Sequence, residues 1–157
     1  MATSQLNTGE SSSKVLEQLR GKHVLITGTT GFLGKVVLEK LIRTVPDIGG
    51  IHLLVRGNKR HPEARARFLD EIATSSVFER LRSDDNEAFE AFVEERVHCV
   101  TGEVTEPMFG LPVYQFQALA NGIDAVINSA ASVNFREELD KALAINTRCL
   151  DNIAELA

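Results

Sequence analysis

The feature that most constrains the fold is the segment 27–34, TGTTGFLG, in which glycine occupies every third position. An apolar run at 23–27 comes directly before it and predicts a buried strand, and the apolar stripe of 32–44 directly after it predicts a helix. A strand that turns sharply into a helix needs close backbone approaches that a Cβ would obstruct. The segment therefore predicts a strand–turn–helix unit whose helix begins at the turn.

Such a turn predicts an anion-binding site. The first N–H groups of a helix lack partners within the helix and carry partial positive charge, so they can hold a pyrophosphate. The last glycine also lets the helix pack closely on the strand. The residues that we predict to contact a dinucleotide here are Gly28, Thr30, Gly31, Phe32, Leu33 and Gly34.

Strands and helices alternate along the rest of the chain. Further strands are predicted at 51–56, 96–101 and 124–128, with helices at 15–19, 62–75, within 76–95, at 114–120 and from 137 onward. This alternation implies right-handed crossovers and an α/β fold with a Rossmann-like, doubly wound parallel sheet in the order 3-2-1-4. We predict that residues 14–157 are the N-terminal part of a dinucleotide-binding domain, truncated at the C-terminus, and that the polar residues 1–13 are a disordered leader.

The end of the second strand indicates which nicotinamide cofactor would bind. An acidic residue at this place bonds the ribose 2′-hydroxyl of NAD, whereas Arg56 stands there in this chain. A guanidinium can bind a 2′-phosphate through bidentate, charge-assisted hydrogen bonds. Arg56 therefore favours NADPH over NADH, with Arg67 as a candidate for a second contact. A solvated strand end is the alternative for Arg56.

Two later positions complete the predicted cleft. Ala130 and Ala131 follow the strand at 124–128, and small side chains there let the backbone pass beside a dinucleotide. Asn146 lies on the apolar stripe of the last helix, so we expect its amide to be buried and hydrogen-bonded. The other members of that stripe are Leu139, Leu143, Leu150 and Ile153.

Composition excludes several other classes of protein. The net charge of -5 over 157 residues provides no basic stripe for nucleic acid. Two cysteines fit a reducing compartment, and no apolar run approaches the roughly 18 residues that a membrane span needs. The histidines and cysteines lack metal-ligand spacing, so no metal site is predicted. We expect a cytoplasmic protein.

Three motifs together resemble a known family. The leading TGxxGxxG is similar to the extended branch of the short-chain dehydrogenase/reductases. The combination of GTTGFLG, LLVRG and SAASVNF resembles bacterial fatty acyl-CoA reductases of the male-sterility type, over about residues 15–157.

The resemblance implies NADPH-dependent reduction of a long-chain acyl-CoA thioester to a fatty aldehyde or alcohol. It also implies residue roles. Glu103 stands where the superfamily commonly has an Asp that bonds the adenine amino group; a surface carboxylate is the alternative. Asn146 stands where an asparagine bonds backbone and water beneath the catalytic residues; an amide that ties the helix to the sheet is the alternative.

The chain departs from the family at its catalytic pair, Tyr-x-x-x-Lys. The only tyrosine is Tyr114, and Ala118 stands four positions later. We therefore predict no catalytic residue and no reduction by this chain alone, and an open edge on the strand at 124–128 that favours self-association. The alternatives are a thioester reductase module, a sugar epimerase, or a dinucleotide-binding sensor without turnover.

Overall fold

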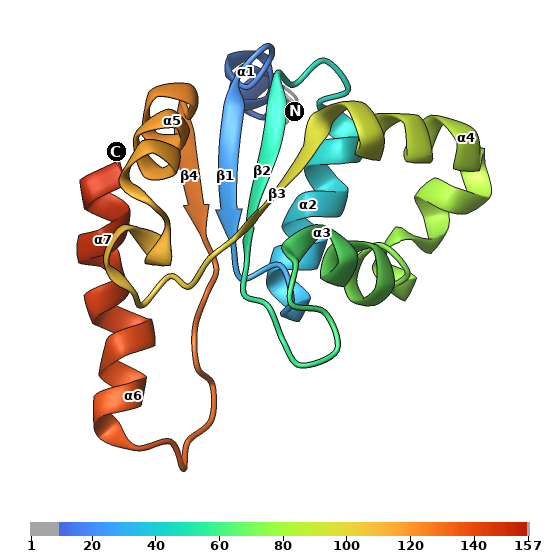
Figure 1. The fold of residues 1–157 in the computed structure, drawn as a ribbon. Coiled ribbons are helices and arrows are strands. Elements are labelled where there is room, and N and C mark those ends of the chain that lie inside the picture. Colours follow the sequence, from blue (N-terminus) through green and yellow to red (C-terminus); the bar gives the residue numbers. More distant parts are fainter. Residues whose placement is uncertain (1–9, 157) are drawn as a thin grey trace, which may run out of the picture.

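The computed structural model of the chain describes residues 10–156, and its centre is a four-stranded parallel sheet (Figure 1). The strands are β1 His23–Thr27, β2 Gly50–Val55, β3 Val97–Thr101 and β4 Ala125–Asn128. Their order is β3-β2-β1-β4. The predicted α/β class and strand order are confirmed.

The register of the strands brings their carboxyl ends together. Thr27 at the end of β1 pairs with Leu54 of β2 on one side and with Asn128 of β4 on the other. Val55 of β2 pairs with Thr101 of β3. The loops that follow all four strands therefore leave the sheet at one edge, where ligands bind in open α/β sheets.

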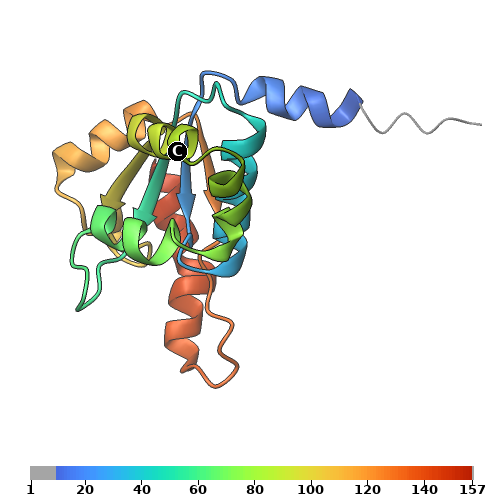
Figure 2. The same cartoon turned by 90° about the vertical axis from the view of Figure 1, so that its right-hand side faces the viewer.

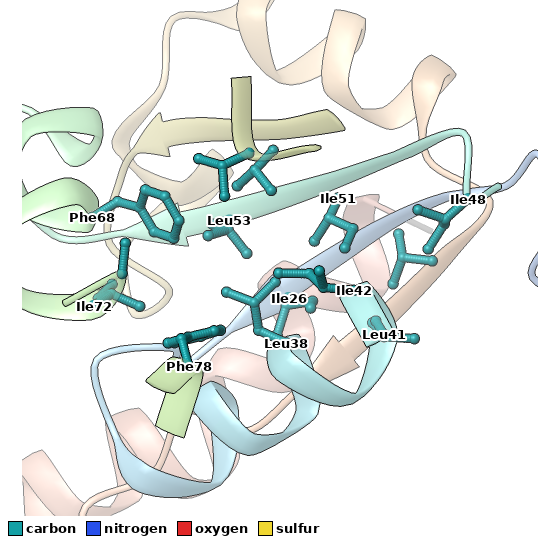
Figure 3. Packing of buried hydrophobic residues seen from close by; sticks show 14 of the residues in the cluster. Ile26, Leu38, Leu41, Ile42, Ile48, Ile51, Leu53, Phe68, Ile72 and Phe78 are labelled. Atoms are coloured by element: carbon teal, nitrogen blue, oxygen red, sulfur yellow. The ribbon is translucent and has the colours of Figure 1, made fainter. Parts of the chain in front are cut away.

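One face of the sheet carries the larger core. The helices α2 Phe32–Thr44, α3 Ala64–Arg67 and α4 Glu79–Arg96 cover this face (Figures 1 and 2). Figure 3 shows the packing of side chains from α2 against those from β1 and β2. Completely or almost completely buried members of this core include Val24, Ile26, Leu38, Ile51, Leu53, Phe68, Ile72 and Phe78. Each such side chain stabilises the fold by about 1.5–3 kcal/mol relative to an exposed one.

The opposite face carries a smaller core around Leu25 and Leu54. It is covered by the 3-10 helix η3 Pro107–Gly110 and by α5 Val113–Gly122 and α7 Cys149–Leu156. Leu25 of β1 is completely buried here while Val24 and Ile26 are buried on the other face. Burial on both faces explains why the central strands are continuous apolar runs.

The helix predicted over 62–75 is interrupted in the structure, and the segment 76–95, where one or two helices were predicted, contains a broken helix. The helix expected over 62–75 consists of α3, the π-helical turn η1 Phe68–Ile72 and a following turn, with the 3-10 helix η2 Ser76–Phe78 after it. The Arg82 guanidinium donates to the carbonyls of Ala73 and Ser75 and so gives these carbonyls, at the end of the helical segment, hydrogen-bond partners. α4 is interrupted at Asp85, whose carboxylate accepts the N–H of Ala88 at 2.9 Å and so restarts the helix as a cap.

The first helix begins earlier than predicted. α1 spans Glu10–Gln18 and includes the last residues of the expected leader. The rest of that leader, 1–9, lies outside the described residues, so its predicted disorder stays a prediction.

The last helical region packs through a different face from the one predicted. It comprises α6 Leu139–Leu143, the π-helical turn η4 Ala144–Arg148, and α7. Leu139, Leu143, Asn146 and Leu150 are exposed, so the predicted buried stripe is wrong at these positions. Its remaining member, Ile153, is partly buried and packs against the smaller core. The helix carries a second, adjacent apolar row, and the contact with the sheet selects that row. Its members are Ile145, Cys149 and Leu156, joined by the amide of Asn152 that donates to the Val104 carbonyl.

Within residues 10–156, no helix combines the length and the apolar character that crossing a membrane requires. The cytoplasmic location stays a prediction.

Candidate functional site

A cleft of about 230 Å³ lies at the carboxyl ends of the strands, between the loops that follow β1, β2, β3 and β4. Eight of the predicted cofactor residues line it: Gly28, Thr30, Gly31, Arg56, Arg67, Glu103, Ala130 and Ala131. Phe32, Leu33, Gly34 and Asn146 do not line it. Segments more than a hundred positions apart in sequence thus meet at one site.

The glycines of the loop after β1 are required by close backbone contacts. Gly28 has a φ of +72°, and a Cβ there would lie 2.5 Å from the Ala130 nitrogen. A Cβ on Gly34 would lie 2.4 Å from the Gly28 carbonyl oxygen. Gly28 therefore lets the loops after β1 and β4 touch, and Gly34 lets α2 start against the turn. The role of Gly34 is packing beside the cleft.

The start of α2 leaves polar groups available to a ligand. Its N-cap residue, Gly31, makes no side-chain cap hydrogen bond, so the first-turn amides of Phe32 and Leu33 have no such partner. The side chains of these two residues point to solvent, so any contact they make to a ligand is through the backbone. The buried hydroxyl of Thr29 also has no hydrogen-bond partner among residues 10–156. Uncapped amides beside an unpartnered hydroxyl fit a diphosphate.

A hydroxyl network joins the ends of β1 and β4. The Ser129 hydroxyl donates to the Thr27 carbonyl at 2.7 Å, and the Thr27 hydroxyl donates to the Asn128 side chain. The Ala130 N–H reaches the Thr27 hydroxyl oxygen at 3.3 Å. This network holds the small residues after β4 against the glycine loop. Sequence reasoning missed Thr27 as a lining residue, although a polar side chain at a strand end was a usable signal. Ser129 belongs to the stretch of small residues that was expected beside the dinucleotide.

The arginine at the end of β2 faces the cleft. Arg56 is 72% exposed, and its Nη1 lies 3.1 Å from Oε2 of Glu103 on the loop after β3. The second carboxylate oxygen of Glu103 accepts the Thr105 N–H at 3.4 Å. Glu103 thus already has partners inside the protein, and the adenine contact implied for it stays a prediction.

The second predicted arginine, Arg67, is held more firmly. Its Nη1 donates to the Arg56 carbonyl at 2.7 Å, and its Nε donates to Glu71 at 2.9 Å. The hydrogen bond from Arg67, followed by one from Asn58, lowers the pKa of the Glu71 carboxyl below its usual value. With its side chain only 16% exposed, Arg67 is a fixed cation at the wall of the cleft.

Asn146 ties the last helical region to the loop after β4. Its Oδ1 accepts the Ser132 N–H at 2.8 Å, and its Nδ2 donates to the Ser132 carbonyl at 3.1 Å. The amide is exposed, so the expectation of burial is wrong, but both of its polar groups have backbone partners. The contact fits a structural role for Asn146 outside the cleft.

Among the described residues, no group of three or more histidine, cysteine or acidic side chains is arranged to hold a metal ion. The apolar residues Val104 and Ile145 also line the cleft. Nothing in their sequence surroundings marks them, because only the tertiary structure brings them there.

Comparisons with known proteins agree with this geometry. The family model described as male sterility protein matches residues 26–157. Fatty acyl-CoA reductase 2, chloroplastic, of Arabidopsis thaliana is 35% identical over 91% of this chain and 23% of its own length. Fatty acyl-CoA reductase 1 of Gallus gallus is 35% identical over 90% of this chain and 26% of its own length. The chain thus spans about a quarter of the length of these curated relatives.

A solved structure extends the similarity to the fold. The terminal R domain from the myxalamid PKS-NRPS biosynthetic pathway superposes with a TM-score of 0.68 and 29% identity, covering 87% of this chain and 31% of that one. The residues matched by the family model, 26–157, include the glycine loop and every residue that lines the cleft. The chain therefore belongs to the male sterility protein family of NAD(P)-binding, Rossmann-like reductase domains.

Proposed function

We propose that the cleft binds NADPH and that the chain is the cofactor-binding part of a reductase of long-chain acyl-CoA thioesters. The observation that carries the proposal is the pairing of an uncapped helix start at Gly31 with two guanidinium groups, Arg56 and Arg67, along the same cleft. One end of the cleft suits a diphosphate and the other suits an additional phosphate.

Binding of the diphosphate is supported by the glycine loop. Gly28, Thr30 and Gly31 line the cleft directly, and the amides of α2 begin behind them. A helix start of this kind supplies N–H donors and a favourable potential without any charged side chain. Both nicotinamide cofactors share this diphosphate, so this part of the cleft does not distinguish them.

Preference for the 2′-phosphate is supported by the end of β2. Arg56 occupies the position at which an acidic residue would favour NADH. Arg67 lies beside it and is held through the Arg56 carbonyl and Glu71. A pair of cations here would stabilise a phosphate that carries nearly two negative charges.

When bound, the cofactor would supply a hydride. In the proposed parent reaction the hydride adds to the thioester carbonyl carbon, the C–S bond breaks, and CoA leaves as a thiol after taking up a proton. The residues of this chain would bind and orient the cofactor for that step. Tyr114 takes no part in it, because its exposed side chain lies on α5 outside the cleft.

A second candidate function is reduction of an acyl thioester carried by a peptide synthetase or polyketide synthase. It is favoured by the similarity to the R domain of the myxalamid pathway. Both candidates use the same cofactor cleft and differ in the group that carries the thioester. Parallel assays of the full-length protein with palmitoyl-CoA and with a carrier-bound palmitoyl group would separate them.

The cofactor proposal is tested by calorimetric titration of NADPH and NADH into the wild-type chain and into Arg56→Glu. We expect Arg56→Glu to weaken NADPH binding by about 10-fold or more, since charged hydrogen bonds contribute about 1.5–3 kcal/mol, and to change NADH binding much less. Arg60→Glu is the matched control, because Arg60 is an exposed arginine on the same loop that pairs with Asp70 outside the cleft. Equal losses for both cofactors in Arg56→Glu would refute the 2′-phosphate role.

A further inference from the structure

The wall of the cleft contains an ion pair between Arg56 and Glu103, and this pair bears on the choice between NADPH and NADH. Val55 of β2 pairs with Thr101 of β3, so the residues that follow these two strands lie across from each other. Arg56 directly follows β2 and Glu103 is the second residue after β3. Their side chains meet with 3.1 Å between Nη1 and Oε2. Arg56, the cation proposed to bind a 2′-phosphate, is therefore already paired with the carboxylate of Glu103.

The two partners differ in how firmly they are held. The side chain of Arg56 is 72% exposed and that of Glu103 is 25% exposed. Glu103 also accepts a backbone hydrogen bond from Thr105, whereas Arg56 makes no other side-chain hydrogen bond among the described residues. Glu103 is consequently the fixed partner, and Arg56 is free to turn its remaining N–H donors toward a ligand.

An exposed ion pair of this kind contributes little stability, typically about 0–1 kcal/mol. A phosphate that carries nearly two negative charges can therefore compete with the carboxylate for Arg56. The carboxylate nevertheless stays in the wall beside the phosphate, where like charges repel. NADH has no phosphate at this place and avoids that repulsion.

The ion pair of Arg67 with Glu71 differs from that of Arg56 with Glu103 in where its carboxylate lies. Its partner Glu71 is absent from the lining of the cleft, and Glu71 is further engaged by the Asn58 side chain at 2.7 Å. Its charge therefore acts mainly on Arg67. Glu103, in contrast, lines the cleft itself.

We propose that Glu103 is a specificity-determining residue, whose carboxylate neutralises Arg56 and thereby limits how strongly the cleft prefers NADPH over NADH. The inference rests on the proposed NADPH site. It assigns to Glu103 an effect on the 2′-phosphate in place of a contact with adenine.

The test is calorimetric titration of NADPH and NADH into the wild-type chain, Glu103→Gln and Glu106→Gln. Glu106 lies on the same loop but does not line the cleft, so Glu106→Gln removes the same charge without removing the pair. We expect Glu103→Gln to raise NADPH affinity by about 3–10-fold, as for one unit charge removed a few ångströms from a phosphate, and to leave NADH affinity within about 2-fold. Glu106→Gln should leave the ratio of the two affinities unchanged.

A double variant and a salt series sharpen the test. If the carboxylate acts through the guanidinium, Glu103→Gln should raise NADPH affinity less in the Arg56→Gln background than in the wild-type background. An equal rise in both backgrounds would contradict that role. The gain should also fall as ionic strength rises from about 0.05 to 0.5 M, because exposed charges are screened. Thermal unfolding of each variant without cofactor shows whether it is folded.

The outcomes separate this inference from the proposed function. Equal affinity changes for both cofactors in Glu103→Gln, or a loss of NADPH affinity, would overturn the role of Glu103 while leaving the NADPH site standing. A wild-type chain that binds neither dinucleotide would overturn the proposed function itself, together with this inference.

Discussion

The two faces of the sheet carry hydrophobic cores of different size. The first region comprises β1, β2 and the helices α2, α3 and α4, and its core contains 18 buried residues. The second comprises β4, the loop after it and the segments on the opposite face of the sheet, which are η3, α5, α6, η4 and α7. The core on that face contains 9 buried residues, of which Leu25 and Leu54 come from β1 and β2. β2 is buried at five of its six positions, whereas β4 has no fully buried residue.

The second region also exposes large apolar side chains. They are Val133, Phe135, Leu139, Leu143 and Leu150. The loop after β4 and α6 project beyond the carboxyl edge of the sheet, as Figures 1 and 2 show. From this comparison we infer that the first region carries most of the stability, while the candidate cleft lies where the two regions meet.

The largest expected effect is in the core of the first region. Phe68, the first residue of η1, is 1% exposed and belongs to the larger core, so Phe68→Ala should lower the free energy of unfolding by about 3–5 kcal/mol. Phe135→Ala makes the same chemical change at a fully exposed phenylalanine and should cost less than about 0.5 kcal/mol. Urea unfolding of both variants measures the difference. Similar losses would contradict the division into a tight and a loose region.

The next effect concerns the contact between the two regions. Gly28→Ala adds a Cβ 2.5 Å from the backbone of Ser129 and Ala130 and also forces alanine into a positive φ. We expect a loss of about 2–4 kcal/mol, combining backbone strain with overpacking. Gly21→Ala is the matched control, because Gly21 has a φ of +66° but no atom within 4 Å of the added Cβ. If the two variants lose equal stability in urea unfolding, the interloop contact contributes nothing.

A third effect is a pH dependence of stability that arises from His52, near the amino ends of the strands. His52 lies between His23 and His98, with ring centroids at 5.5 and 4.9 Å, and Nδ1 of His23 lies 3.2 Å from its Nε2. Burial, then His98 and His23, lower the pKa of His52 from 6.5 to about 4.

As the pH falls, His52 therefore takes up a proton at a higher pH in the unfolded chain than in the folded chain. Stability should fall as pH drops from about 6.5 toward 4, and it should be retained above that window. His52→Phe removes this titration, so the stability difference between pH 8 and pH 5 should be smaller than in the wild-type chain. Thermal unfolding at both values measures it; an unchanged difference would exclude His52 as the source.

The smallest effect on stability is expected at the exposed side chains of α6 and α7. Leu139→Lys combined with Leu150→Lys should change the free energy of unfolding by less than about 0.5 kcal/mol, because both leucines are exposed. The same variant should reduce self-association in sedimentation velocity, since two exposed apolar side chains of α6 and α7 are replaced by charged ones. Leu69→Lys, at an exposed leucine of the first region, is the control. Identical sedimentation of wild type and double variant would remove this surface as a site of association.

Much of the cofactor cleft was predictable from local pattern. The glycine triplet placed the turn between β1 and α2, and Arg56 followed from the end of the apolar run of β2. The prediction of which face of the last helix is buried was wrong for most of its residues. The helix has two adjacent apolar rows, and Asn146 lies on the row that is mostly exposed. The π-helical turn η1 was missed. Over 76–95 the sequence left one or two helices open, and the break at Asp85 depends on a local contact, the hydrogen bond from the Ala88 N–H to the Asp85 carboxylate.

The sequence alone determined the strand–turn–helix unit, the alternation of strands and helices, and the cation at the end of β2. These follow from backbone sterics and side-chain periodicity, which act over a few residues. Only the tertiary structure decided that Arg56 faces Glu103, that Thr27 bonds Ser129, and which face of the last helix is buried. Such pairings join residues far apart in the chain, and the register of the parallel strands sets which of them meet.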